Sequence, residues 1–271
     1  MQITWLTDIH LNFIDLAERE QFYQKIINTA CEGVFITGDI AEAPSIVDIM
    51  NEMVHFIQKP IYFVLGNHDY YKGDVKQVRE SMIKLTSTNK QLFWLPASGI
   101  QWLNDSTIIL GQDGWADGRF GDYQHSTVRL NDSRLINDLF QASLQGNDML
   151  LKKMQNLADI DAKNLSDNLT QATAKQPQKI IILTHIPPFK ESCMHLGQAS
   201  DDNWLPYFSS KATGNVILQV ASQNPQIEFL VLCGHTHSKS YYQATDNLLI
   251  KAGVAEYYQP EIQEVIEILK N

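Results

Sequence analysis

Side chains that can bind metal ions occur in five short clusters, each directly after a run of apolar residues. The runs and the residues that follow them are ITWLT with Asp8 and His10, VFIT with Asp39, IYFVL with Asn67, His68 and Asp69, IIILT with His185, and FLVLC with His235 and His237. Carboxylate, amide and imidazole groups are ligands that first-row divalent metals accept in proteins. The clusters therefore predict a metal centre with oxygen and nitrogen ligands.

The number of these ligands indicates two metal ions rather than one. The candidates are two aspartates, one asparagine and four histidines: Asp8, His10, Asp39, Asn67, His185, His235 and His237. A single first-row ion that also binds substrate cannot use so many ligands, whereas two ions that share one bridging carboxylate can. The number of ligands therefore predicts two divalent ions. The mixture of nitrogen and oxygen ligands without cysteine indicates that these ions are Mn, Fe, Zn, Ni or Co.

The spacing inside two clusters suits a shared site. Asp8 and His10 are two residues apart, as are His235 and His237. In an extended segment, residues i and i+2 point to the same side, so we expect each pair to present two side chains together.

The apolar runs predict the strands that must position these groups. In the first half of the chain, strand-like runs at 3–7, 34–37 and 61–65 alternate with helical patterns, which is typical of a parallel sheet. Further strand candidates lie at 92–95, 100–103, 107–110, 180–184, 229–233 and 247–252, and EIQEVIEILK (261–270) is compatible with a helix or a strand. Ligands of open α/β sheets bind at the carboxyl ends of strands, so the five clusters should converge.

Residues 119–178 differ from the rest in being rich in Asn, Gln and Asp. Apolar residues still recur there at helical spacing, which predicts one or two amphipathic helices. This segment would be either a structural insertion or a lid that shapes the substrate site. We expect residues 1–271 to form a single domain that contains it.

Composition limits the classes of function. The 271 residues carry a formal net charge of −10 and are 44% hydrophobic, so we expect a folded protein that does not bind nucleic acid through a basic surface. Three cysteines give no disulfide framework. Neither a signal peptide nor an apolar run long enough to span a bilayer is visible, so we expect a cytoplasmic protein without a membrane partner.

The five clusters, taken in order, resemble the sequence blocks of the calcineurin-like metallophosphoesterases. That family carries D-x-H, G-D, G-N-H-D/E, a single H, and G-H-x-H, and here these blocks read TDIH (7–10), TGDIAE (37–42), LGNHD (65–69), THIPP (184–188) and CGHTH (233–237). The resemblance implies an α/β fold in which two mixed β-sheets pack face to face between flanking helices, a four-layer α/β/β/α sandwich with the metals at the strand ends.

The resemblance also implies a role for each residue. Asp8, His10 and His237 would bind one metal ion, Asn67, His185 and His235 would bind the other, and Asp39 would bridge them. His68 and Asp69 would be the catalytic residues, and His68 would act as the general acid or stabilise the leaving oxygen. Its neighbour Asp69 would fix the loop or orient a ligand. Two divalent ions lower the pKa of a bridging water, and the hydroxide formed would attack phosphorus in line.

Two departures from the family's pattern concern the substrate. The protein phosphatases of this family carry arginines in the second and third blocks, whereas GDIAEAP and LGNHD lack both. THIPP is similar to the H-x-P-P of family members that hydrolyse cyclic nucleotides and other small phosphodiesters. The resemblance thus implies a phosphodiesterase acting on a small phosphate ester or nucleotide. The alternatives are a phosphomonoesterase, a nuclease, and a non-catalytic scaffold that binds proteins.

Other residues are weaker candidates for contact with substrate. Arg119, in the glycine-rich stretch GQDGWADGRFGD, could supply a cation for phosphate. Lys190, Cys193 and His195 follow His185 on a loop and could reach the substrate. Tyr70 could stack on a ring, although packing in the core explains it as well.

Overall fold

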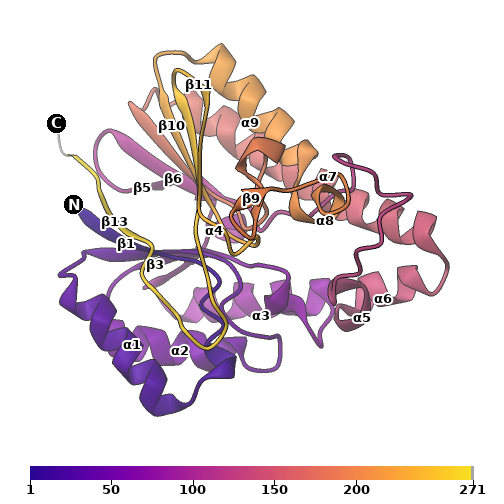
Figure 1. The fold of residues 1–271 in the computed structure, drawn as a ribbon. Helices are drawn as coiled ribbons and strands as arrows, with labels where there is room; N and C mark the ends of the chain where they lie inside the picture. The colour runs from indigo at the N-terminus through magenta and orange to yellow at the C-terminus, as the bar shows by residue number, and fades with distance from the viewer. Residues whose placement is uncertain (270–271) are drawn as a thin grey trace.

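Two mixed β-sheets form the centre of the computed structural model, which describes residues 1–269 (Figure 1). The first sheet has the order β13-β1-β2-β3-β4, and the second has the order β11-β12-β10-β7-β6-β5. The strands of the first sheet are β1 (Gln2–Leu6), β2 (Gly33–Thr37), β3 (Ile61–Val64), β4 (Leu92–Trp94) and β13 (Glu264–Glu267). Those of the second are β5 (Gln101–Trp102), β6 (Thr107–Gly111), β7 (Lys179–Leu183), β10 (Glu228–Cys233), β11 (Ser240–Thr245) and β12 (Leu248–Ala252).

Each sheet is parallel at its centre, with an antiparallel strand at one edge of the first sheet and at both edges of the second. Strands β1 to β4 pair in parallel, and β13 joins β1 in antiparallel register, with Ile3 opposite Ile266. In the second sheet β6, β7, β10 and β12 are parallel, while β5 and β11 are antiparallel edge strands. The predicted strands are therefore confirmed. Within EIQEVIEILK, whose residue 270 lies outside the described part of the chain, Glu264–Glu267 form the strand β13.

Helices cover the outer face of each sheet (Figure 1). Helices α1 (Leu16–Asn28), α2 (Ile46–Ile57) and α3 (Val75–Thr88) pack on the first sheet, and α7 (Asn147–Thr173) and α9 (Lys211–Gln223) pack on the second. Shorter elements are α4 (Leu95–Ser98), α5 (Asp132–Leu135), α6 (Asn137–Ser143), α8 (Leu205–Phe208), the hairpin β8 (Met194–His195) and β9 (Gln198–Ala199), and the 3-10 turns η1 (Leu11–Phe13), η2 (His68–Tyr70) and η3 (Lys190–Ser192). The expected α/β/β/α sandwich is thus confirmed.

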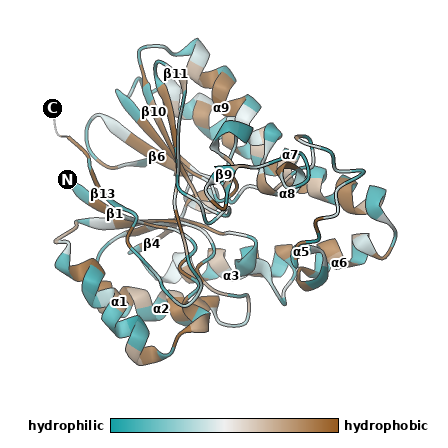
Figure 2. Cartoon of the chain, in the orientation of Figure 1, coloured by the Kyte–Doolittle hydropathy of each residue, from teal (hydrophilic) through white to brown (hydrophobic). Residues whose placement is uncertain are grey.

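Alternation along the strands explains why both faces are buried. In β7, Ile180 and Ile182 pack against the helices α7 and α9, whereas Ile181 and Leu183 face the first sheet. Successive side chains of a strand point to opposite faces, so a central strand covered on both sides must be apolar throughout. Figure 2 accordingly shows hydrophobic residues concentrated along the strands.

The polar segment 119–178 contains α5, α6 and α7. The predicted number of helices, one or two, was therefore too low. Helices α5 and α6 span only four and seven residues, which is too short to produce a clear hydrophobic periodicity in the sequence. The 27-residue α7 buries Leu150, Met154, Leu157, Leu165 and Leu169. No helix within residues 1–269 is long and apolar enough to cross a membrane.

Candidate metal centre

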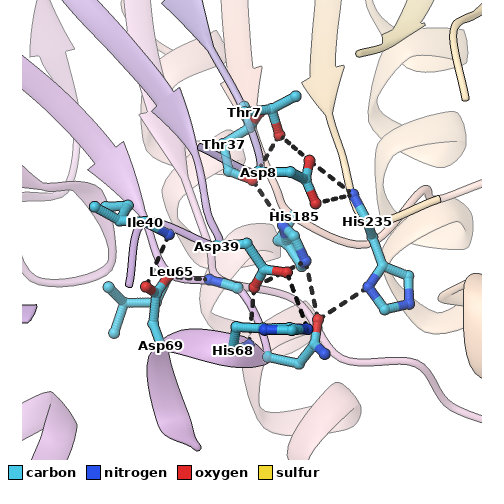
Figure 3. A network of polar contacts seen from close by, with 12 residues as sticks. Thr7, Asp8, Thr37, Asp39, Ile40, Leu65, His68, Asp69, His185 and His235 are labelled. Atoms are coloured by element: carbon cyan, nitrogen blue, oxygen red, sulfur yellow. Dashed lines mark hydrogen bonds and ion pairs between the residues drawn. The ribbon is translucent and has the colours of Figure 1, made fainter. Parts of the chain in front are cut away.

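The five predicted clusters meet at one place between the sheets. Strands β1, β2 and β3 end there from the first sheet, and β7 and β10 end there from the second. Figure 3 shows Asp8, Asp39, His185 and His235 converging from these strand ends. Asp8, His10, Asp39 and His185 are at most 2% exposed, so the protein removes their polar groups almost completely from water.

One group of ligand atoms comes from Asp8, His10, Asp39 and His237, whose candidate donor atoms all lie within 4.8 Å of one another. His237 Nε2 is 3.4 Å from Asp8 Oδ1 and also 3.4 Å from His10 Nε2. His10 Nε2 lies 3.9 Å from Asp39 Oδ2. Unprotonated imidazole nitrogens and carboxylate oxygens at these separations can share one divalent cation.

A second group surrounds the side-chain oxygen of Asn67. His185 Nε2 is 3.0 Å and His235 Nδ1 is 2.9 Å from Asn67 Oδ1. His185 Nε2 also lies 3.4 Å from Asp39 Oδ1, whereas Asp39 Oδ2 faces His10. Asp39 therefore presents one carboxylate oxygen to each group, which is the arrangement a bridging ligand requires.

Backbone carbonyls determine which imidazole nitrogens face the second group. His185 Nδ1 lies 2.8 Å from the carbonyl oxygen of Thr37, and His235 Nε2 lies 3.0 Å from that of Tyr207. When each of these nitrogens donates its proton to the carbonyl, the other nitrogen turns a lone pair toward Asn67 Oδ1. For His235 this places two acceptors 2.9 Å apart, an arrangement that a cation between them would stabilise.

The pKa directions also indicate a site that favours positive charge. Burial lowers the pKa of His10 to about 4, and burial together with repulsion from His185 lowers that of His235 to about 4. Burial opposes a charge on His185 as well, but Asp39 outweighs it and raises the pKa of His185 to about 10. Burial alone would raise the pKa of Asp39, yet the neighbouring histidines hold it well below its ordinary value. Asp39 is thus held as the anion and His10 and His235 as neutral imidazoles, the forms that bind metals, whereas His185 would have to exchange its proton for the metal ion.

Left-handed backbone conformations aim most of the ligands. Asp8, His10, Asp39, His235 and His237 have φ values between 40° and 71°. Each such conformation costs a non-glycine residue about 1–3 kcal/mol, and these conformations cluster at functional sites. The segments after β1 and β10 are thus tight turns. The expectation that the i, i+2 pairs lie on extended segments was wrong, because the strands end before the ligands begin.

Two glycines allow the strand ends to approach. A Cβ on Gly66 would meet Asp39 Oδ1 and lie 2.6 Å from the Asp39 nitrogen, and one on Gly38 would lie 2.7 Å from His185 Nδ1. Gly38 also has φ +89°. Only a residue without a side chain fits at these positions, so the glycines that precede the clusters are part of the site.

His68 and Asp69 have different surroundings. The His68 imidazole is partly exposed, stacks on Tyr71 at 4.2 Å between centroids, and has Nε2 3.9 Å from Asp39 Oδ2. Asp69 is buried, and its carboxylate accepts hydrogen bonds from the backbone N–H groups of Ile40, Ala41 and Gly66 at 2.8–2.9 Å. Asp69 therefore ties the loop after β2 to the loop after β3. These contacts are those of a residue that fixes the loops around the site.

A cavity of about 410 Å³ opens beside these residues. Its wall includes Asp39, Asn67, His68, His235 and His237, together with Tyr71, Leu130, Asn131, His195, Leu196, Phe208, Thr236, Ser238, Ala255 and Tyr257. His195, one of the weaker candidates, is thus at the cavity, whereas the buried Cys193 and the exposed Lys190 are not among its lining residues. Arg119 is paired with Asp117 and Asp159 and does not line the cavity. Tyr70 is a core residue that donates to Asp113.

Sequence reasoning missed two residues of this site. The Tyr257 ring lies 4.7 Å from that of His10 and 5.0 Å from that of His237, and its hydroxyl is 3.4 Å from His68 Nε2. Asp132 accepts hydrogen bonds from Asn67 and Tyr71. Neither residue follows an apolar run that ends at the site, so no local pattern distinguishes them.

Comparisons with known proteins agree with this geometry. Residues 1–239 match the model of the calcineurin-like phosphoesterases. A sequence comparison with curated proteins found no match. Among solved structures, the phosphopantetheinyl hydrolase of Mycobacterium tuberculosis is similar, with a TM-score of 0.61, 11% identity, and coverage of 94% of this chain and 89% of that one. A dimetal phosphatase from Danio rerio is also similar, with a TM-score of 0.59 and 12% identity. This match covers 94% of this chain and 87% of that one.

These structural likenesses, at low identity, concern the fold, while the family match extends over most of the chain. The residues that converge at the strand ends, from Asp8 to His237, all lie within the matched residues 1–239. The protein belongs to the calcineurin-like phosphoesterase family, whose members depend on two divalent metal ions.

Proposed function

We propose that this protein is a dinuclear metal-dependent phosphodiesterase that hydrolyses a small phosphate ester. Asp8, His10 and His237 would hold one ion, Asn67, His185 and His235 the other, and Asp39 both. When bound, the two ions would supply positive charge for the phosphoryl oxygens and an activated water for in-line attack on phosphorus.

The chain itself would supply the proton for the leaving oxygen. His68 lines the cavity, and stacking on Tyr71 limits the rotation of its ring. Its backbone N–H donates to Asp39 Oδ1 at 2.8 Å, which holds the turn against the metal centre. An imidazole placed at the cavity wall can protonate a departing alkoxide, a step worth about 10²–10⁴-fold in rate.

The charge of the cavity wall supports a diester rather than a monoester. Among the described residues that line it, there is neither lysine nor arginine. A monoester carries about −1.5 to −2 charges near pH 7, whereas a diester carries one. With histidines as the only basic side chains in the wall, the metal ions would have to neutralise the whole charge of a monoester. The single charge of a diester is the better match.

The size of the cavity and the charge of the protein support a small substrate. A volume of about 410 Å³ is in the range of small-molecule sites. The net charge of −10 opposes association with nucleic acid. The similar structure from Mycobacterium tuberculosis is that of a phosphopantetheinyl hydrolase, and a compact organic phosphate of that class would suit this cavity.

We also propose that the chain forms one domain, with the segment 119–178 as a wall of the substrate site. Leu130 and Asn131 line the cavity, and the next residue, Asp132, is hydrogen-bonded to Asn67. These contacts favour the lid interpretation over a purely structural insertion. Residues 270 and 271 lie outside the described part of the chain.

Activity after metal replacement tests the proposal. The protein would be stripped with chelator, supplied with Mn, Fe, Zn, Ni or Co, and assayed on bis-p-nitrophenyl phosphate and p-nitrophenyl phosphate. We expect metal-dependent cleavage with the diester preferred, and a loss of about 10²–10⁴-fold in His68→Ala. His55→Ala, an exposed histidine on α2, is the matched control. A monoester preference would identify a phosphatase, and bound metal without cleavage of either ester would favour the scaffold.

A further inference from the structure

A second cavity of about 120 Å³ lies beside the metal centre, between the loop after β6 and the segment that contains α5, α6 and α7. Trp115 comes from the loop, Leu139 from α6, and Leu150 and Met154 from α7. All four are at most 7% exposed. These side chains give the cavity a mainly apolar wall, distinct from the imidazole-rich wall of the first cavity.

Three contacts connect the second cavity to the metal centre. Leu130 lines both cavities. Asp132 lines the second cavity while its carboxylate accepts from Asn67 Nδ2 at 2.8 Å. Tyr207 also lines the second cavity, and its carbonyl oxygen accepts from His235 Nε2. The second cavity therefore adjoins the metal centre at Leu130, Asp132 and Tyr207.

The polar groups of the wall indicate a ligand site rather than a packing defect. Trp115 is 4% exposed, and its indole Nε1 has no hydrogen-bond partner among the described residues. A buried donor without an acceptor is unfavourable unless a ligand or water supplies one. Arg129 lies at the rim and donates to the carbonyl oxygens of Ser126 and Val128, with no carboxylate paired to it within residues 1–269. Trp115 and Arg129 therefore offer hydrogen-bond donors to a ligand in this cavity.

We propose that the second cavity binds the organic group of the phosphate ester whose phosphorus lies at the metal centre. The group would be compact and mainly apolar, about the size of a six-membered ring, and would carry one hydrogen-bond acceptor. Size supports this class, because an apolar cavity of about 150 Å³ in another protein accepts benzene. This inference rests on the proposed function and specifies the substrate that the function acts on.

Two esters that differ in one group test the inference. p-Nitrophenyl phenyl phosphate and p-nitrophenyl methyl phosphate release the same chromophore but carry a ring or a methyl group on the other ester oxygen. Burial of a ring predicts a KM lower by about tenfold for the phenyl ester. The two esters also differ in intrinsic reactivity, so the ratio of their KM values must be compared between variants of the protein.

Ser143→Phe would fill the second cavity, because Ser143 lines it from the end of α6. We expect this variant to remove the preference for the phenyl ester, which changes the ratio of KM values by about tenfold. Ser166→Phe introduces the same side chain at a partly buried position on α7 that lines neither cavity, and it should keep the wild-type ratio. An unchanged ratio in Ser143→Phe would overturn the inference while leaving the proposed function intact.

A binding experiment separates the two proposals even if no ester is cleaved. Benzamide has a ring and a carbonyl acceptor but no phosphate, so its binding does not depend on metal chemistry. Saturation-transfer NMR should detect benzamide on the wild type and on Ser166→Phe, and the signal should disappear in Ser143→Phe. The absence of benzamide binding to the wild type, or equal binding to all three proteins, would contradict the inference.

Discussion

Asp132 Oδ1 accepts a hydrogen bond from Asn67 Nδ2 over 2.8 Å, and this bond joins the α5 segment to the metal centre. Because Nδ2 and Oδ1 belong to the same amide, holding Nδ2 turns Oδ1 toward His185 and His235. Tyr71 donates to the same Asp132 oxygen at 2.7 Å. Asp132 is therefore a positioning residue for a proposed metal ligand.

Replacing Asp132 should weaken metal binding without removing a ligand. In Asp132→Ala the Asn67 amide keeps only its longer hydrogen bond, 3.3 Å to the Tyr71 hydroxyl. We expect the affinity for one of the two ions to fall by about 10–100-fold, the usual effect of losing such support. Calorimetric titration with Mn²⁺ would measure it. Asp132→Asn, which keeps an acceptor, should recover most of the affinity, and the exposed control Asp105→Ala should bind as the wild type does. Equal affinities in Asp132→Ala and wild type would refute the positioning role.

Tyr257 should contribute to turnover through His68. Its hydroxyl lies 3.4 Å from His68 Nε2, and its ring packs over His10 and His237. Removing the hydroxyl in Tyr257→Phe should lower kcat by about tenfold or less, as expected for one hydrogen bond. Tyr257→Ala, which also exposes the imidazoles to water, should lower it further. Steady-state kinetics on the diester would measure both, with the exposed Tyr241→Phe as control. Full activity in Tyr257→Ala would contradict this role.

Arg79 should stabilise the folded protein, because it pairs with two buried carboxylates close to the end of β3. Its Nη2 is 2.9 Å from both carboxylate oxygens of Asp161 and 3.4 Å from Asp113. Asp113 in turn accepts from the N–H of Leu65, at the end of β3. Arg79→Ala would leave two buried carboxylates without a cation, and we expect the free energy of unfolding to fall by about 3–5 kcal/mol. Urea denaturation would measure this, and the exposed Arg134→Ala should change stability by less than about 0.5 kcal/mol. If Arg79→Ala and Arg134→Ala lowered the free energy of unfolding by similar amounts, the proposed stabilisation by Arg79 would be contradicted.

Glu52 should make stability depend on acid pH. Partial burial alone would raise its pKa, but hydrogen bonds from Arg19 and Tyr23 lower the pKa below the ordinary value. A lowered pKa in the folded state stabilises the protein above the unfolded-state pKa of about 4.3, and this stability is lost as the pH falls through the folded-state pKa. The difference in unfolding free energy between wild type and Glu52→Gln should therefore shrink from about pH 6 to about pH 3. Glu20→Gln, at an exposed position, should show no such trend. A constant difference for Glu52→Gln would contradict the pKa direction.

The sequence predicted those parts of the protein that have a local signal. Buried parallel strands require continuous apolar runs, and IYFVL and IIILT are readable for that reason. The metal-binding groups directly follow such runs, so knowing where a strand ends also locates the ligand. Gly38 and Gly66 could be recognised because a close approach of two backbones leaves no alternative to glycine.

Residues that reach the site through long-range contacts could not be predicted in this way. Tyr257 lies beyond the matched residues 1–239, and it reaches the site because β13 returns to pair with β1 at the opposite end of the chain. The segment before β13 has neither an apolar run nor a ligand motif. Asp132 lies in a polar segment where one carboxylate looks like any other, and only the folded structure places it beside Asn67.

The left-handed backbone conformations could not be predicted from the sequence for a different reason. Aspartate and histidine adopt positive φ more readily than most residues, but they do so in few of their occurrences. Nothing in TDIH reveals that Asp8 and His10 both take this conformation. The surrounding structure imposes it, since His235 N–H donates to the Asp8 carboxylate at 3.0 Å from a distant strand.

The number of divalent ions bound per chain is the most direct test of the metal centre. The protein would be loaded with Mn²⁺, dialysed, and analysed by inductively coupled plasma mass spectrometry, alongside Asp39→Ala and the exposed control Asp105→Ala. We predict two ions per chain in the wild type and in the control, and fewer than two in Asp39→Ala, because Asp39 presents one oxygen to each ligand group. A wild-type protein that binds no ion, or an Asp39→Ala variant that still binds two, would contradict the account.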